Sequence, residues 1–173
     1  GGGPGMVMRP DILAYSYDTL VNQSALNSKN YAKVVLSPRG KKFSQNLAKR
    51  FALLEGIVLV CGRYEGVDQR FIDARELEEI SVGDYILSGG EPAAIVLIDS
   101  VVRLLPGVIG SPAALIKESF EDGLLEYPQY TRPKNWENHE VPEVLISGNH
   151  GEISKWRLEK SISETKERRP DLW

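Results

Sequence analysis

The pattern of apolar and polar positions along the chain predicts short buried strands that alternate with helices. Apolar runs predict strands over residues 33–36, 56–60 and 79–82. Apolar positions at helical spacing predict helices over residues 43–54 and 67–74, between these strands. The run over 56–60 is continuous and rich in branched residues, as in a strand that is buried on both faces. The pattern therefore predicts an α/β fold with a parallel sheet.

The pattern changes after a further helix, which is predicted over residues 92–105. This helix is apolar on nearly all sides, and a Pro-Gly pair stops it. Five of the ten prolines lie within residues 106–142, where there is little periodicity, so we expect a long, partly mobile connection there. One more strand is predicted over residues 144–146. A final helix is predicted through Ile153 and Ile162.

The composition excludes several classes of protein. Of the residues, 42% are hydrophobic and 26% are charged, as in ordinary globular proteins. The longest apolar run covers residues 93–98, far short of the ~18 residues that cross a membrane. Cys61 is the single cysteine and there are two histidines, too few for a Cys/His zinc site or an internal disulfide. We therefore expect a cytoplasmic protein with no membrane segment and no metal.

Charge is distributed unevenly along the chain. The formal net charge of −3 argues against a protein that is coated in nucleic acid. Residues 19–54, however, contain seven basic residues and no acid, and the tail from Ser154 is basic again. Residues 61–91, between these zones, are mainly acidic among their charged positions. Two basic zones around an acidic centre would hold an anionic polymer. Ordinary solvated helix faces are the alternative explanation.

Small-residue loops follow three predicted strands, at residues 37–40, 61–66 and 83–90, and residues 1–6 form a fourth such loop. In parallel sheets, ligands bind beyond the carboxyl ends of the strands, and glycine lets the backbone approach a ligand closely. The sequence lacks the glycine-rich phosphate motifs, the nucleophile elbow and the paired ligands of metal sites. It therefore predicts a backbone-lined pocket for an uncharged, purine-like group.

A series of motifs is more specific than any single loop. The chain contains, in this order, GGGPGM, LSPRGKKF, LVCGRYEGVDQR, ISVGDYILSGGE, LIDSVVRLLPGV, ESFEDGLLEYPQYTRP and LISGNHGEISKWRL. In this series it resembles the bacterial tRNA (guanine-N1)-methyltransferases, which belong to the SPOUT class of knotted methyltransferases. The likeness runs from residue 1 to about residue 172, so it covers essentially the whole chain.

The resemblance implies a domain organisation and a reaction. It implies a deep trefoil knot within an α/β domain over residues 1–109, a linker over 110–140 and the start of a helical tRNA-binding domain over 141–173. It also implies that the chain is a piece of a longer protein, which the abrupt sequence ends favour as well. The implied enzyme is a cytoplasmic homodimer. It transfers a methyl group from S-adenosylmethionine to N1 of the guanosine at position 37 of tRNA.

The resemblance also implies which residues bind the methyl donor. Most belong to the small-residue loops, where backbone groups would hold adenine and ribose. For Glu65, a structural role in its loop is an equally good explanation. The implied residues are Leu36, Ser37, Pro38, Gly62, Tyr64, Glu65, Val82, Gly83, Asp84, Tyr85, Ile86, Leu87, Gly89, Gly90 and Glu126.

Two further residues correspond to the catalytic pair of the family. Guanine N1 must lose its proton before it attacks the methyl group, so a carboxylate within reach acts as general base. The resemblance places that base at Glu118, where the family commonly has aspartate. It places at Arg103 the arginine that stabilises negative charge on the guanine carbonyl oxygen. Glu65 and Glu126 are the other acidic candidates for the base.

Basic residues near the end of the chain are candidates for contacts with RNA phosphates. Each of them taken alone is no better a candidate than an ordinary surface charge. Two other functions remain open: a knotted methyltransferase that acts on another RNA site, and a non-catalytic RNA-binding module. The candidate RNA-binding residues are Arg132, Lys155, Arg157, Arg168 and Arg169.

Overall fold

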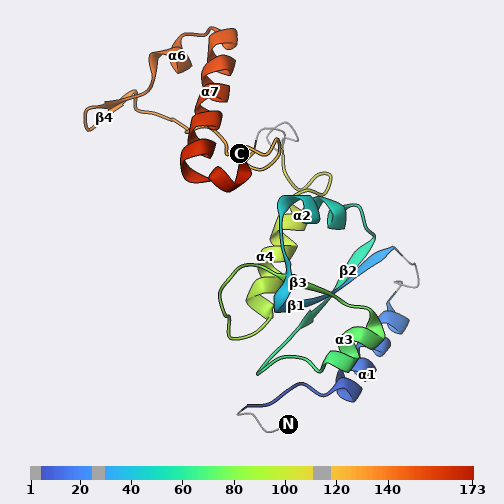
Figure 1. The fold of residues 1–173 in the computed structure, drawn as a ribbon. Helices are drawn as coiled ribbons and strands as arrows, with labels where there is room; N and C mark the ends of the chain where they lie inside the picture. Colours follow the sequence, from blue (N-terminus) through green and yellow to red (C-terminus); the bar gives the residue numbers. More distant parts are fainter. Residues whose placement is uncertain (1–4, 25–29, 111–117) are drawn as a thin grey trace. The chain divides into compact units, whose positions relative to one another are not determined.

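The computed structural model describes residues 5–24, 30–110 and 118–173. They belong to two compact units, Gly1–Gly110 and Ser111–Trp173. The loop predicted over residues 1–6 therefore lies mostly outside the described residues. The elements of the first unit are, in order, α1 (Pro10–Gln23), β1 (Tyr31–Lys42), α2 (Gln45–Ala52), β2 (Gly56–Cys61), α3 (Gln69–Arg75), β3 (Glu78–Ser81) and α4 (Glu91–Val102) (Figure 1).

The three strands of the first unit form one parallel sheet, with β1 in the centre and β2 and β3 beside it. Val34 of β1 lies opposite Leu59 of β2 and Glu78 of β3. Helices precede and follow each strand along the chain. The prediction of an α/β fold with a parallel sheet is therefore confirmed.

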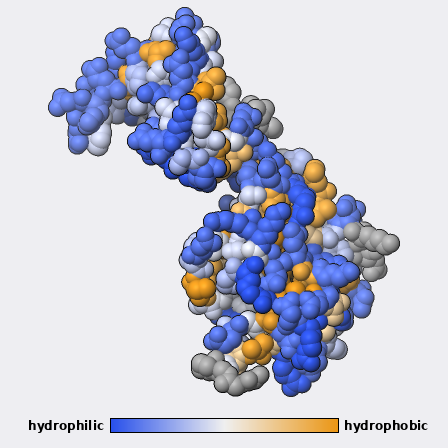
Figure 2. Space-filling view, viewed as in Figure 1, coloured by the Kyte–Doolittle hydropathy of each residue, from blue (hydrophilic) through white to orange (hydrophobic). Residues whose placement is uncertain are grey.

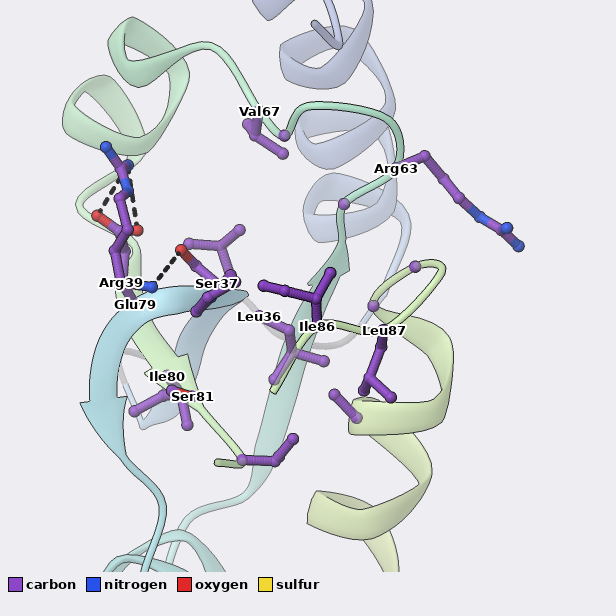
Figure 3. Close-up of a pocket in the computed structure, with 18 of the residues that line it drawn as sticks. Leu36, Ser37, Arg39, Arg63, Val67, Glu79, Ile80, Ser81, Ile86 and Leu87 are labelled. Carbon is purple, nitrogen blue, oxygen red and sulfur yellow. Dashed lines mark hydrogen bonds and ion pairs between the residues drawn. The ribbon is translucent and has the colours of Figure 1, made fainter. Parts of the chain in front are cut away.

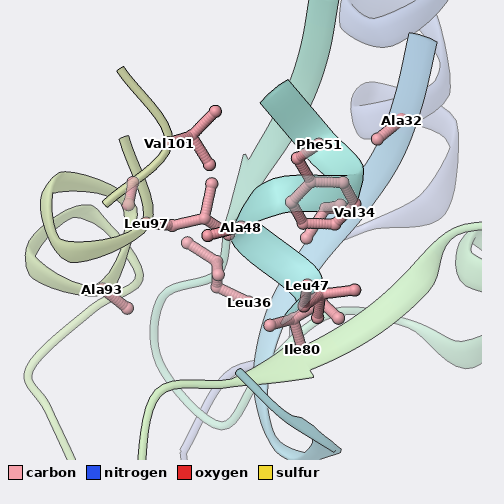
Figure 4. Close-up of a cluster of buried hydrophobic side chains, with 11 residues drawn as sticks. Ala32, Val34, Leu36, Leu47, Ala48, Phe51, Ile80, Ala93, Leu97 and Val101 are labelled. Carbon is pink, nitrogen blue, oxygen red and sulfur yellow. The ribbon is translucent and has the colours of Figure 1, made fainter. Parts of the chain in front are cut away.

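Helices cover both faces of this sheet. Helices α2 and α4 pack on one face, and α1 and α3 pack on the other (Figure 1). Successive side chains of a strand point to opposite faces, so Val34 and Leu36 join the cluster under α2, and Val35 joins the cluster under α1. In the first cluster, Phe51 of α2 and Leu97 of α4 pack against the strands (Figure 4). The central strand thus belongs to both hydrophobic cores.

The chain reverses its direction across the sheet at β1. From β1 it passes through α2 to β2 on one side, and then through α3 to β3 on the other side of β1. These two helices cover opposite faces. In open α/β sheets, the loops diverge at such a point and leave a crevice at the carboxyl ends of the strands. The fold therefore places a potential ligand site beyond β1.

The turn predicted over residues 37–40 is wrong, because β1 continues through these residues. The pairing of β1 with β3 is irregular there and shifts register between Leu36 and Lys41. Pro38 has no N–H to donate to a neighbouring strand, and the Arg39 N–H donates to Ser37 Oγ at 3.2 Å. An irregularity within a continuous strand therefore takes the place of the turn.

The elements of the second unit are β4 (Asn135–Trp136), β5 (His139–Glu140), α6 (Glu143–Ile146), α7 (His150–Arg168) and the 3-10 helix η1 (Pro170–Leu172). Helix α7 confirms the final helix that the sequence predicts through Ile153 and Ile162. Thr165 of this helix is completely buried. Its Oγ1 accepts a hydrogen bond from Leu125 N at 2.8 Å and donates one to Ser161 O at 2.6 Å. Thr165 thereby attaches the segment before α6 to α7.

The strand predicted over residues 144–146 is also wrong, because these residues belong to α6. Leu145 N donates to Pro142 O at 3.0 Å, and Pro142 is the N-cap of this helix, where its missing N–H breaks no helical hydrogen bond. A run of three apolar residues does not distinguish a strand from a helix. Two further features, α1 and the β4–β5 hairpin, lie where the sequence pattern predicts no element.

Within the described ranges, no helix is both long and apolar enough to span a membrane. Helix α7 has 19 residues, but it carries charged side chains throughout its length. In the same ranges, no three histidine, cysteine, aspartate or glutamate residues gather in a way that would hold a metal ion.

Candidate functional site

A pocket of about 490 Å³ lies at the carboxyl end of the sheet. Its walls come from the irregular part of β1, the loop after β2 and the long loop between β3 and α4 (Figure 3). Pockets for small molecules typically measure roughly 300–1,000 Å³. The pocket has a suitable size and lies where the chain reverses across the sheet, so it is the candidate site for a ligand.

Several glycines line the pocket, so main-chain atoms form the wall at these positions. A Cβ atom on Gly62 would meet only Val67 Cγ2, at 3.5 Å, and one on Gly66 would meet nothing within 4 Å. Gly66 also has a φ of +119°, which residues with side chains rarely adopt. The two glycines therefore leave open space that side chains would fill.

A buried serine fixes the turn after β3. Ser81 is 6% exposed. Its hydroxyl donates to Gly83 O at 3.0 Å and accepts from Gly83 N at 3.2 Å. The Tyr85 hydroxyl donates to Val82 O at 3.2 Å. These bonds hold Val82 and Gly83 in the pocket wall, next to the end of the strand.

Apolar side chains from two elements meet in the pocket. Leu36 from β1 lies beside Ile86 and Leu87 from the loop after β3 (Figure 3). Leu36 is 8% exposed, whereas Ile86 is 80% exposed. A large apolar side chain that is exposed at a pocket becomes buried when a flat apolar ligand covers it. We therefore expect this part of the pocket to take an aromatic ring.

Ion pairs border the pocket. Arg39 contacts Glu79 at 3.2 Å and Gln69 at 2.8 Å. Arg63 contacts Glu91 at 2.9 Å, and its side chain points away from the centre of the pocket (Figure 3). The pKa of Glu91 lies below its usual value because its own backbone N–H and the Arg63 side chain hydrogen-bond to the carboxylate. These charged groups are thus paired with one another.

The whole chain is similar in sequence to one family of proteins. A family model described as "tRNA (Guanine-1)-methyltransferase TrmD" matches residues 1–173. The chain belongs to the tRNA (guanine-1)-methyltransferase family. A "tRNA (guanine-N(1)-)-methyltransferase" of Chelativorans sp. is 57% identical over 173 residues, which are 100% of this chain and 72% of that protein. A protein of the same name from Agrobacterium fabrum is 55% identical over 172 residues, which are 99% of this chain and 72% of that protein.

In this member of the tRNA (guanine-1)-methyltransferase family, the residues that are predicted to bind the methyl donor belong to the first unit, with the exception of Glu126. All of them except Asp84 and Glu126 line the pocket. Asp84 belongs to the loop after β3, but its exposed carboxylate pairs with Lys42 at 3.2 Å. Glu126 belongs to the second unit, where its carboxylate accepts from Gln129 at 2.5 Å and its N–H donates to Ser119 Oγ at 2.9 Å.

The two predicted catalytic residues belong to different units. Arg103 is half-buried and forms the C-cap of α4, where its N–H donates to Asp99 O at 3.2 Å. Glu118 is half-buried in the second unit, and its backbone carbonyl accepts from Glu121 N at 3.3 Å. The roles of both side chains stay predictions.

The predicted RNA-binding residues all belong to the second unit. Arg132 and Arg157 line a second pocket, and Lys155 is exposed on α7. Arg168 and Arg169 are ion-paired with acidic residues near the end of α7, at 2.5 and 2.7 Å. Among these five, Arg132, Lys155 and Arg157 therefore offer a positive charge that has no acidic partner within the described residues.

Sequence reasoning missed the charged edge of the first pocket. Arg63 belongs to the CGRYEG motif, and its position in a small-residue loop after a strand is a signal that it lies at the pocket. Arg39 and Glu79 come from two different strands, β1 and β3, which only the register of the sheet brings together. The order of residues within one strand does not show which residue of a neighbouring strand will form an ion pair with it.

The Gly90→Ala variant should separate β2 from α4 and destabilise the first unit. A Cβ atom on Gly90 would lie 2.7 Å from Cys61 Cα and 2.9 Å from Gly62 N, which are closer than real Cβ contacts. Because backbone must move to make room, we expect the free energy of unfolding to fall by about 1–3 kcal/mol. Urea unfolding followed by circular dichroism measures this change.

Gly89→Ala is the matched control for that variant. A Cβ atom on Gly89 would meet Glu91 Oε2 at 2.6 Å and Arg63 Nε at 2.9 Å. These atoms are the ends of flexible side chains, which can move aside. We expect a loss of less than about 1 kcal/mol. An equal loss in both variants would contradict the steric explanation.

Proposed function

We propose that this chain transfers a methyl group from S-adenosylmethionine to N1 of the guanosine at position 37 of tRNA, next to the anticodon. The observation that carries the proposal is that CGRYEG and VGDYILSGGE, two motifs of a chain in this family, converge on one pocket at the carboxyl end of a parallel sheet. The similar proteins named above are called tRNA (guanine-N(1)-)-methyltransferases.

The residues of the pocket fit S-adenosylmethionine. Its adenine ring is flat, and Leu36, Ile86 and Leu87 offer an apolar surface to it. Main-chain groups of the small-residue loops would hydrogen-bond the ring nitrogens and the ribose, and the open space at Gly62 and Gly66 admits a ligand. When bound, S-adenosylmethionine supplies a methyl group that is electrophilic because it is attached to positively charged sulfur.

In the proposed reaction, Glu118 acts as the general base. It takes the proton from guanine N1, and N1 then bonds to the methyl carbon while the bond from that carbon to sulfur breaks. Arg103 donates hydrogen bonds to the guanine carbonyl oxygen, on which negative charge develops. Glu65 and Glu126 are the remaining carboxylate candidates for the base.

The proposal extends to the architecture. It includes a deep trefoil knot within residues 1–109, a linker over 110–140, the start of a tRNA-binding domain over 141–173 and a cytoplasmic location. The loop after β2 forms hydrogen bonds with the segment before α1, beside the pocket, and this contact supports the proposed knot. Glu65 N donates to Met6 O, and Met8 N donates to Gly66 O, both at 2.9 Å. Distant parts of the chain thus meet beside the sheet.

The proposal also includes a homodimer, which the outer face of α4 supports. Leu97 and Val101 lie on the side of this helix that packs into the core. Ile95, Ile98 and Val102 share another side and are 68%, 48% and 40% exposed. A helix that is apolar on both sides is stable when a second surface covers it. A second copy of the chain can cover it through a two-fold axis.

Ile98→Glu should weaken this dimer about tenfold or more, because a charge in an apolar interface loses its hydration. Sedimentation across a dilution series measures the dissociation constant. Leu53→Glu is the matched control, because Leu53 is 83% exposed and lies outside α4. A monomeric unmodified chain, or an equal effect of both variants, would rule out α4 as the interface.

Mass mapping of tRNA tests the proposed function. The full chain is incubated with S-adenosylmethionine and an unmodified transcript that carries guanosine at position 37. We expect one methyl group on that guanosine and none on a transcript with adenosine there. A methyl group on another nucleotide would indicate a knotted methyltransferase of different specificity. RNA binding without methyl transfer would indicate a non-catalytic module.

A further inference from the structure

A second pocket, of about 310 Å³, lies within the second unit. Residues 127–132 line one part of it, together with Lys134. Val141, α6 and Arg157 of α7 complete the lining. The volume falls at the lower end of the range for small ligands, so the pocket can hold one flat ring rather than a larger molecule.

Aromatic rings and cations lie next to one another in this pocket. The Arg157 guanidinium lies 4.7 Å from the centre of the Tyr127 ring. Tyr130 packs edge-to-face against Trp156, with ring centres 6.2 Å apart. Tyr130 is 47% exposed, so much of its ring remains open to a ligand. An aromatic ring that is held by another ring and still exposed is a suitable stacking surface.

The charges of this pocket lack acidic partners. Arg132, Lys134 and Arg157 line it, and no carboxylate of the described residues forms an ion pair with any of them. In the first unit, by contrast, Arg39 and Arg63 are both ion-paired. Arg157 Nε is moreover buried without a hydrogen-bond partner among the described residues. The pocket therefore carries positive charge that an anionic ligand would neutralise.

We infer that this pocket binds one unpaired nucleotide of RNA, with the base against Tyr130 and a phosphate at Arg132 and Lys134. An apolar patch over α6, within a mainly hydrophilic surface, provides further contact for a ring (Figure 2). In a double helix the faces of the bases are covered by stacking, so only an unpaired base can reach an aromatic side chain. This inference rests on the proposed function, because it takes RNA as the substrate.

Fluorescence anisotropy with two RNA probes tests the inference. One probe is a hairpin with a tRNA anticodon stem and loop, and the other is a blunt duplex with the same number of phosphates. Tyr130→Leu keeps an apolar side chain but removes the aromatic face. We expect it to weaken binding of the hairpin about five- to a hundredfold and to leave binding of the duplex unchanged. Lys134→Gln should reduce the salt dependence for the hairpin by about one phosphate contact.

Two further variants keep the test specific. Tyr130→Phe retains the ring and should bind the hairpin as the unmodified chain does. Trp136→Leu removes a ring from β4 that is 62% exposed but does not line the pocket, so it should not affect binding. The inference is overturned if the unmodified chain does not bind the hairpin, if Tyr130→Leu weakens hairpin and duplex equally, or if Tyr130→Phe binds as weakly as Tyr130→Leu.

These measurements contain no methyl donor, so they separate the pocket from the reaction. If mass mapping finds no methylated guanosine but Tyr130→Leu selectively loses the hairpin, the proposed function is wrong and the pocket stands. If guanosine is methylated and Tyr130→Leu binds the hairpin normally, the function stands and the inference about the pocket is wrong.

Discussion

Glu118→Gln is expected to lower the rate of methyl transfer by about 10²–10⁴-fold and to leave the affinity for S-adenosylmethionine unchanged. The amide keeps the shape of the side chain but cannot accept the proton of guanine N1. Single-turnover measurements with saturating tRNA report the chemical step, and calorimetry reports binding of the methyl donor. A base must be deprotonated to act, so the rate of the unmodified chain should fall toward acidic pH, and the variant should lose that dependence.

Two other variants show whether the effect belongs to this carboxylate. Glu137→Gln changes an exposed glutamate of the same unit, between β4 and β5, to which no role in binding or catalysis is assigned, and should retain most of the activity. Glu118→Asp shortens the side chain by one methylene and tests whether the site has adapted to the longer arm. Full activity of Glu118→Gln would reassign the base. Loss of activity in Glu126→Gln or Glu65→Gln, with an unchanged affinity for S-adenosylmethionine, would show to which residue.

The parts of the fold that the sequence predicts are those with a local physical signal. The run over residues 56–60 predicts β2 because a parallel strand covered on both faces must be apolar throughout. Loops rich in small residues after β2 and β3 predict the pocket, because the carboxyl ends of parallel strands meet at one edge. The structure places both loops in the wall of one pocket. These signals predict a purine-like group as the ligand, and only the resemblance to the family implies S-adenosylmethionine itself.

The parts that the sequence does not predict depend on distant partners. Pro38 is typical of a turn, yet β1 continues past it because pairing with β3 resumes at Lys41 after a shift of register. Residues 144–146 are typical of a strand, yet no strand pairs with them and they form α6. The apolar floor of the second pocket therefore comes from a helix. Pairing between strands is a property of the assembled sheet and is not visible in the order of residues.

Arg103→Ala and Glu118→Gln, each nearly inactive alone, are expected to restore activity when the two chains share a dimer. Arg103 ends α4 in the first unit, Glu118 belongs to the second unit, and the exposed apolar side of α4 is the proposed interface. If each site combines Arg103 of one copy with Glu118 of the other, a mixed dimer has one site with both changes and one with neither. Random mixing then leaves about a quarter of all sites intact, and the rate should recover to about a quarter of the unmodified rate.

The reverse mixture checks the same geometry with the opposite outcome. A chain with both substitutions is mixed with the unmodified chain, and tags on the two chains measure the mixed dimers. If sites are shared between copies, every site of a mixed dimer lacks one residue, and only about a quarter of all sites work. If each copy builds its own site, about half of them work, and the first mixture shows no recovery. That second pair of results would exclude a shared site and would place Arg103 and Glu118 of one chain in the same site.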